Sequence, residues 1–246
     1  MTEPSSNLSN SREEQQETGL FWIPDALTIE LGIQLVAWAE AQILPDWIKR
    51  IRQDIGFEYG INLPPVRMRD AMDLSPSAYR LRLYGCEVAQ GAVMLNHLLA
   101  IDDKGDKPPI DGVEVLDPVD GNIAYWIESS NQQRTMEAGY LIVDAVDVMV
   151  THITKIVKSH LHHFLGLQET RNLLKALRET HPAVVESVAL SCLGLVDIQN
   201  IFCGLLRDHV SIRDLPVVLT TIADYGRDTR DMETLIRYVK QALRYE

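Results

Sequence analysis

The hydrophobic periodicity of this chain changes once along its length, near Asp147, and this change limits the folds that the chain can adopt. Before Asp147, short stretches such as Leu27–Leu31 alternate apolar and polar residues, and helix-like and turn-like segments separate them. After Asp147, apolar residues recur at helical spacing almost to the end. We therefore expect a mixed α/β or α+β first part followed by a helical bundle.

The first part carries signals for several short elements. A half-buried strand is expected at Leu27–Leu31, closed by Gly32, and Pro45 suits the first turn of a helix that ends at Gly56 or Gly60. Two strands with one basic edge each follow, and then a small sheet-containing unit between Asn96 and Asp144. The predicted segments are strands Val66–Arg69, Tyr79–Leu83, Val113–Val115, Ala124–Ile127 and Tyr140–Val143, a loop at Asp102–Pro109 and a helix at Ser130–Ala138.

The second part is predicted to be helical throughout. The expected helices are Val148–Phe164, Glu169–Glu179 stopped by Pro182, Asp197–His209, Asp214–Tyr225 and Asp231–Leu243. Asp147, Asp197, Asp214 and Asp231 stand where a carboxylate would cap or start a helix, close to unpaired backbone N–H groups.

The charge of the chain points to protein partners. The 246 residues include 35 Asp and Glu against 23 Lys and Arg, so the net charge is −12 and repels nucleic-acid phosphates and anionic lipids. Asp197–Tyr225 has the helix, short turn and helix of a helix-turn-helix motif. Its second helix, Asp214–Tyr225, contains no Lys or Arg, which a DNA-recognition helix would need. We expect no nucleic-acid partner.

The amino-terminal residues and the cysteines further limit the class of protein to which this chain can belong. Residues 1–20 are polar with almost no large apolar side chains, which predicts a disordered linker. Neither a signal peptide nor an apolar run of about 18 residues occurs in the sequence. Cys86, Cys192 and Cys203 are scattered, without metal-binding spacing, and are expected to be buried thiols in a reducing compartment.

Two clusters of titratable residues could carry chemistry. His160 and His163 are spaced to share one helix face and could bind a metal, but no carboxylate or thiolate stands at ligand spacing; the alternative is a pair of part-buried helix residues, with His162 exposed. The second cluster, Asp208 to Asp214 with His209 and Arg213, brings acid, base and cation together, but a helix end and a new helix cap explain it without catalysis.

Common catalytic motifs are missing from the sequence. It contains no GxSxG nucleophile turn, no phosphate-binding GxxxxGK[ST], no GxGxxG and no HExxH. We therefore expect a binding protein rather than an enzyme, with no cofactor and no metal.

Four strings in the sequence are more specific than its periodicity. They are IRQDIGFEYGINLPPVRMRDAMDLSPSAYRLRLYGCEVAQG (Ile51–Gly91), DPVDGNIAYWI (Asp117–Ile127), EAGYLIVDAVDVMVTHITKIV (Glu137–Val157) and HVSIRDLPVVLTTIADY (His209–Tyr225). In this order they resemble the FlhA/SctV-type export-gate family of flagellar and type III secretion systems, in particular its flagellar members. The resemblance runs from about Asp25 to the end of the chain. Its most specific pieces are P-P-x-R-x-R-D with P-x-x-Y-R, G-Y-x-x-V-D with T-H, and V-S-I-R-D-L.

The resemblance implies a cytoplasmic region of four compact subdomains, joined by a linker to a membrane portion and assembled into a ring of about nine copies. Three subdomains can be placed on this sequence. The first, α/β, would comprise residues 21–95 and 145–164, the second, also α/β, would be inserted in it at 96–144, and the third, helical, would span 165–246. The fourth subdomain is expected to be absent.

The resemblance also implies a site. A hydrophobic dimple between the first two subdomains accepts export chaperones with bound substrates, and its lining corresponds to Asp117, Asp120 and Thr151. Asp120 stands where the family usually has an aromatic residue. The alternatives are local: Asp117 and Asp120 could each serve a turn, and Thr151 could hydrogen-bond within its helix. Phe21 and Trp22 would be the linker residues that contact a neighbouring copy, and the alternative is that they pack on their own subdomain.

These observations predict a docking platform of a flagellar-type export gate that binds chaperone–substrate complexes and other export-apparatus proteins and forms a ring. It would act at the cytoplasmic face of the inner membrane. The alternative is a stand-alone soluble scaffold or regulator without a secretion role.

Overall fold

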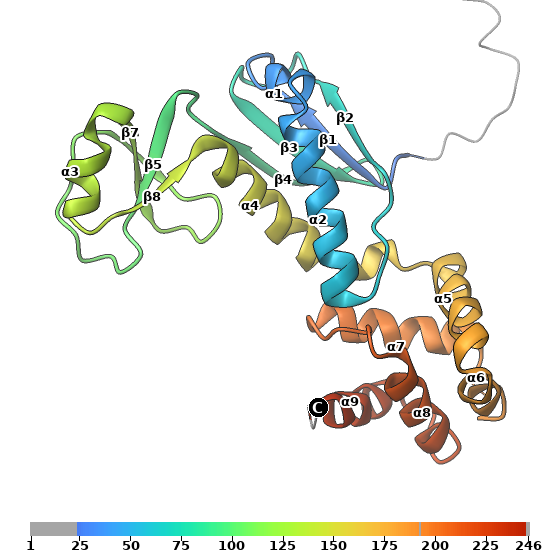
Figure 1. Ribbon diagram of the computed structural model, residues 1–246. Coiled ribbons are helices and arrows are strands. Elements are labelled where there is room, and N and C mark those ends of the chain that lie inside the picture. The colour runs from blue at the N-terminus through green and yellow to red at the C-terminus, as the bar shows by residue number, and fades with distance from the viewer. Residues whose placement is uncertain (1–23, 192, 245–246) are drawn as a thin grey trace, which may run out of the picture.

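The computed structural model of the chain describes residues 24–191 and 193–244 (Figure 1). The linker predicted for residues 1–20, the contact residues Phe21 and Trp22, and Cys192 lie outside the described residues. The first sheet along the chain lies in the middle of the molecule together with α2 (Ile43–Tyr59). A second, smaller sheet lies at one end and the helical part lies at the other (Figure 1).

The first sheet has four strands in the order β2-β1-β3-β4. They are β1 (Leu27–Leu31), β2 (Val66–Asp70), β3 (Ala78–Leu83) and β4 (Cys86–Ala92). β1 pairs parallel with β2 and antiparallel with β3. A parallel pair needs a crossover connection, and α1 (Val36–Glu40) and α2 (Ile43–Tyr59) provide it. Gly60 caps α2 in the left-handed region, with φ of 76°.

Both faces of β1 are buried, which corrects the expectation of a half-buried strand. Leu27, Ile29 and Leu31 belong to the main core, as expected from the alternation. Thr28 and Glu30, the two intervening residues, are buried as well. The polar face is covered by side chains of the neighbouring strands rather than by another layer of the fold.

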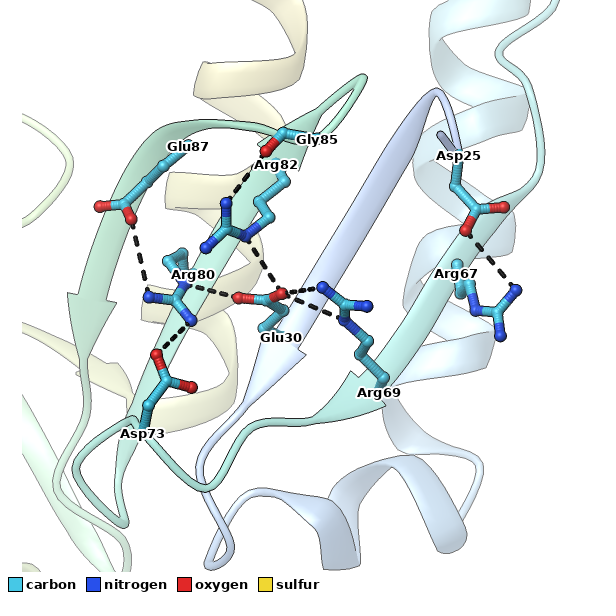
Figure 2. A network of polar contacts seen from close by, with 9 residues as sticks. All are labelled: Asp25, Glu30, Arg67, Arg69, Asp73, Arg80, Arg82, Gly85 and Glu87. Atoms are coloured by element: carbon cyan, nitrogen blue, oxygen red, sulfur yellow. Dashed lines mark hydrogen bonds and ion pairs between the residues drawn. The ribbon is translucent and has the colours of Figure 1, made fainter. Parts of the chain in front are cut away.

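Arginines from two strands converge on Glu30, the buried carboxylate at the centre of the first sheet (Figure 2). Arg69 Nε donates a hydrogen bond to Glu30 Oε1 over 3.0 Å, and Arg80 Nε donates to Oε2 over 2.5 Å. Arg82 Nε lies 3.1 Å from Oε1. Arg80 also binds Asp73, with its Nη2 2.7 Å from Oδ2. The two basic strand edges seen in the sequence therefore share one acidic partner.

The ionic environment determines the protonation of Glu30. Burial alone would raise the pKa of its carboxyl group, but the contacts from Arg69, Arg82 and Arg80 lower this pKa to about 2. Its side chain is only 4% exposed. The carboxylate is therefore charged at neutral pH, and a buried charge is stable only when it is paired.

The second sheet is antiparallel throughout, with the order β6-β7-β5-β8. Its elements are β5 (His97–Ile101), β6 (Val113–Leu116), β7 (Ile123–Glu128), η1 (Ser129–Asn131), α3 (Gln132–Glu137) and β8 (Leu141–Asp144). It has a small core of its own, formed by Ala100, Tyr125, Ile127 and Tyr140. In the predicted loop after β5, the buried Asp102 carboxylate accepts hydrogen bonds from the backbone N–H groups of Lys104, Gly105 and Lys107.

Helices make up the rest of the described chain. They are α4 (Ala145–Ser159), η2 (Leu161–Phe164), α5 (Leu167–Thr180), α6 (Pro182–Ala189), α7 (Leu195–Arg207), α8 (Leu215–Tyr225) and α9 (Met232–Leu243). The main core extends from the helix-covered face of the first sheet into this part. α4 runs from the second sheet past the first sheet toward the helical part (Figure 1).

Two of the four predicted caps are confirmed and two are corrected. Asp214 and Asp231 cap α8 and α9, because their carboxylates accept hydrogen bonds from backbone N–H groups. Asp144 rather than Asp147 caps α4, which begins three residues earlier than predicted. Asp197 lies inside the first turn of α7, where its carboxylate accepts a hydrogen bond from the backbone of Gly194.

The fold class expected from the sequence, two small α/β units followed by helices, is confirmed. The exact subdomain bounds stay predictions. Cys86 is exposed and Cys203 half-buried, so the expectation of buried thiols is wrong for Cys86. Within the described ranges, we find no helix whose length and apolar character would let it cross a membrane.

Candidate functional site

Asp117 stabilises the turn between β6 and β7 through hydrogen bonds of its side chain and its backbone. Its side chain accepts hydrogen bonds from the backbone N–H groups of Val119, at 3.1 Å, and Asp120, at 3.2 Å. Its backbone N–H donates to Asn122 O, and its carbonyl accepts from Gly121. Only 4% of the residue is exposed. Of the two roles considered for Asp117, the structure therefore supports the turn directly.

Asp120 lies at the surface of the same turn and is paired with α4. Lys155 Nζ is 2.8 Å from Asp120 Oδ1 and also donates a hydrogen bond to the carbonyl of Val119. The side chains of Asp120 and Lys155 are 61% and 53% exposed. An ion pair thus occupies the position where the resemblance implies an aromatic side chain.

Thr151 is exposed on α4, one turn before Lys155. It lines a groove of about 740 Å³ between α2 and α4. The buried residues Ile51, Ile55 and Val150 also line this groove. Thr154, and not Thr151, donates its hydroxyl to the backbone of its own helix among the described residues. Thr151 is therefore free to contact a partner.

Charged side chains border the groove on both helices. Asp54 and Glu58 line it from α2, and Lys155 and Lys158 line it from α4. Lys158 Nζ lies 2.7 Å from Glu58 Oε2 and joins the two helices near their carboxyl ends. An apolar floor with charged edges suits an amphipathic protein partner better than a small apolar ligand.

A second hollow lies between the two sheets. It has a volume of about 910 Å³ and is lined from β4, β6 and β7, with Val93, Leu116 and Trp126 among its residues. Pro118 of the turn also lines this cleft. The turn at residues 117–121 therefore borders the cleft through Pro118, and its Asp120 pairs with Lys155, which lines the groove. The three predicted site residues do not line one shared cavity.

Tyr79 and His152 form a buried pair where α4 covers the first sheet. Tyr79 Oη and His152 Nδ1 are hydrogen-bonded at 2.8 Å. Burial lowers the pKa of His152, although the charge of Asp117 acts in the opposite direction. Burial, with a further contribution from Asp117, raises the pKa of the Tyr79 hydroxyl. Asp117 is thus electrostatically coupled to the contact between α4 and the first sheet.

The histidines at the end of α4 are arranged differently from the prediction. α4 ends at Ser159, and His162 and His163 lie on the 3₁₀ helix η2. His163 is exposed, whereas His162 is half-buried and its Nδ1 has no hydrogen-bond partner among the described residues. His160 Nδ1 lies 2.7 Å from the carbonyl of Ile156. The expected exposures of His162 and His163 are therefore reversed, because the helix tightens after Ser159.

Neither titratable cluster shows the geometry of a reactive centre. Residues 24–191 and 193–244 contain no group of three or more His, Cys, Asp or Glu side chains that could hold a metal ion. Asp208 pairs with Lys240 at 2.5 Å, and Asp214 caps α8. The Arg213 guanidinium lies 4.2 Å from the centre of the Phe57 ring. These contacts support the structural reading of the second cluster.

Comparison with known proteins determines the family. The sequence model of the FHIPEP family matches residues 2–246. The chain belongs to the FHIPEP family. It is 39% identical over 222 residues to the flagellar biosynthesis protein FlhA of Bacillus subtilis, a match that covers 89% of this chain and 33% of that protein. The chain therefore spans about a third of the length of the curated relatives it matches.

Solved structures support the fold assignment. The structure of the Chlamydia pneumoniae CdsV and CdsO protein complex matches with a TM-score of 0.77 at 20% identity, over 91% of this chain and 71% of that one. The nonameric EPEC SctV-C structure matches with a TM-score of 0.68 at 25% identity, over 90% of this chain and 67% of that one. These likenesses establish the fold of the described region.

The strings by which the chain resembles its FHIPEP relatives hold the parts of the structure together. Arg69 and Arg80, both from the string Ile51–Gly91, bind Glu30. Tyr79 and His152, from two different strings, bind each other.

The V-S-I-R-D-L string joins the helical part to the end of α2. Ser211 Oγ donates a hydrogen bond to Glu58 O over 2.7 Å, and the backbone N–H of Ile212 donates to Tyr59 O over 3.1 Å. Arg213 lies against Phe57. Sequence reasoning missed these roles because each contact joins segments far apart in the chain.

Proposed function

We propose that this chain is a non-catalytic docking platform of a flagellar-type protein export gate. Export chaperones with bound substrates would dock where the turn at residues 117–121 meets α4. Copies of the chain would form a ring at the cytoplasmic face of the inner membrane and contact other export-apparatus proteins. FHIPEP membership and the identity to B. subtilis FlhA support the export role.

The assembly part of the proposal has its own support. The EPEC SctV-C relative is described as nonameric, and the C. pneumoniae CdsV relative is described in complex with CdsO. A closed ring requires head-to-tail contacts between two different faces of each copy. The contact residues proposed for the linker are Phe21 and Trp22.

The observation that carries the docking proposal is the rim of the α2–α4 groove. Thr151 is exposed there, and the Asp120–Lys155 ion pair lies one helical turn away. Interfaces draw most of their energy from a few buried contacts, with polar residues at the rim that fix orientation. Trp47 and Ile51 of the groove offer such contacts, and Thr151 offers a polar rim. Asp120 joins this rim through its ion pair with Lys155.

Calorimetric titration tests the proposal. The probe is a flagellar export chaperone bound to its filament-type substrate, titrated into the unaltered chain and into Thr151→Ala. We expect Thr151→Ala to weaken binding at least about tenfold, or about 1.4 kcal/mol. Thr220→Ala, which alters an exposed threonine in the middle of α8, is the matched control and should bind as the unaltered chain does.

Two outcomes would contradict this assignment. Equal affinities for Thr151→Ala and the unaltered chain would remove Thr151 from the docking surface. No binding by the unaltered chain would favour the alternative, a soluble scaffold or regulator without a secretion role. Asp117→Ala is a poor probe, because Asp117 holds the turn itself.

A further inference from the structure

The Asp120–Lys155 ion pair is weakly held and open to exchange. Both side chains are more than half exposed, and exposed ion pairs contribute little to stability because water and salt screen them. Lys155 has a second acceptor in the carbonyl of Val119, which does not depend on Asp120. A partner could therefore take over the Asp120 carboxylate while Lys155 keeps the turn bound to α4.

Asp120 has unused capacity to accept hydrogen bonds. A carboxylate offers about four acceptor positions on two oxygens. Lys155 uses one of them, at Oδ1, and Oδ2 receives no hydrogen bond from residues 24–191 and 193–244. A planar arginine guanidinium can donate one hydrogen bond to each oxygen of a carboxylate at once, and this bidentate geometry is not available to a lysine ammonium.

The surrounding charges favour a cationic partner group over an anionic one. Of the lysines along the groove, Lys155 and Lys158 are already paired, with Asp120 and Glu58. On the α2 side, Asp54 and Arg50 have no ion pair within the described ranges, and the Arg50 guanidinium lies over the Trp47 ring. The net charge of −12 also attracts cations and repels anions.

We propose that Asp120 is a specificity determinant of the docking surface, and that the docked protein presents an arginine whose guanidinium replaces Lys155 at the Asp120 carboxylate. This inference rests on the proposed docking function. It assigns to the turn an ionic contact in place of the apolar anchor implied by the resemblance. A partner that presents an apolar side chain at this point would leave the carboxylate without compensation and be rejected.

The test exchanges the two charges within the chain. Asp120→Lys combined with Lys155→Glu keeps an ion pair between the turn and α4 but presents a cation where the partner arginine would bind. We expect this double variant to bind the chaperone–substrate complex at least about tenfold more weakly than the unaltered chain. We also expect the affinity of the unaltered chain to fall as salt rises, and this dependence to be lost in the double variant.

A matched exchange controls for effects on folding and on total charge. Asp208→Lys combined with Lys240→Asp swaps another part-exposed ion pair in the helical part, and it should leave binding unchanged. Circular dichroism would verify that both double variants keep the fold.

The outcomes separate this inference from the function on which it rests. If the unaltered chain binds and the Asp120/Lys155 exchange binds equally well, the ion pair only fastens the turn and the inference is wrong, while the docking function stands. If the unaltered chain does not bind the complex at all, both are wrong. Weakened binding of this exchange alone supports both.

Discussion

Glu30 faces away from the helices of its sheet, yet its carboxylate is buried beneath arginines from two neighbouring strands (Figure 2). Arg80 is also mostly buried and depends on this carboxylate. Removal of one member of such a cluster leaves the other charges without compensation. The loss of Glu30 would therefore weaken the first sheet.

We expect Glu30→Gln to lower the free energy of unfolding by about 3–5 kcal/mol, because the arginine charges lose their buried partner. Urea denaturation followed by circular dichroism measures this change. Glu87→Gln is the matched control, since Glu87 is 45% exposed and lies 3.7 Å from Arg80. The control should cost less than about 1 kcal/mol. Similar small losses in both variants would show that the cluster is not important for stability.

His162 gives the stability a dependence on pH. Burial, and then the charges of His163, Arg207 and His160, lower its pKa from 6.5 to about 4. The unfolded chain therefore binds the proton first as the pH falls, so stability is lost between pH 6.5 and about 4. His152 shifts in the same direction. Glu30 adds a further loss between pH 4.5 and about 2, because its pKa is lowered in the folded chain.

Unfolding in urea at a series of pH values tests this dependence. His162→Gln should reduce the loss of stability between pH 7 and pH 4 by on the order of 1 kcal/mol, a modest figure because the side chain is only partly buried. His181→Gln, at an exposed position, should leave the pH profile as it is. An unchanged profile in His162→Gln would exclude His162 as its source.

At the residue scale, the sequence indicated part of this chemistry. The arginines of β2 and β3 were recognisable as basic strand edges, because they alternate with apolar residues. Glu30 was not recognisable as their shared partner, because that depends on β1 lying between β2 and β3. In the same way, Asp120 was identified as a departure from its family, but its contact with Lys155 joins residues 35 positions apart.

The junction between α2 and the helical part depends on Gly60. This residue has φ of 76°, and a Cβ atom there would lie 2.6 Å from Arg213 Cα. Gly105 has a similar φ of 72°, but a Cβ atom there would meet nothing within 4 Å. Substitution of Gly105 by alanine would therefore add backbone strain alone. The same substitution at Gly60 would add backbone strain and a clash with Arg213.

Gly105→Ala should cost about 1 kcal/mol of unfolding free energy, the strain of an L-residue in the left-handed region. Gly60→Ala should cost at least about twice as much, because the loop at residues 211–213 must also move away from α2. Urea denaturation of the two variants provides the comparison. Equal losses would mean that this loop adjusts without loss of its contacts to Glu58 and Tyr59.

At the element scale, predictions succeeded where one face of an element is buried. α2 and α8 show that pattern clearly in the sequence, and the alternation in β1 predicted the strand although both of its faces are buried. β4 was missed because CEVAQGA has little apolar alternation and is largely exposed. α6 was missed because Pro182 was interpreted only as the end of α5, whereas it also begins α6 at a position where proline is favoured.

At the scale of the whole molecule, the single change in periodicity predicted the order of the parts correctly. The mixed units come first and the helices follow, and the main core joins the first sheet to the helical part. Periodicity could not predict how the turn of the second sheet rests on α4, because that contact depends on two exposed side chains. The candidate site is for this reason the least predictable part of the fold.

α4 contacts both sheets and α2 along its 15 residues. It begins at the cap provided by Asp144 of β8, binds the first sheet through His152, holds the turn through Lys155 and reaches α2 through Lys158. Rotation of this helix about its axis would strain all of these contacts at the same time. α4 therefore links the turn at residues 117–121 to the first sheet and to α2, and a partner that displaced this turn would act on both through one helix.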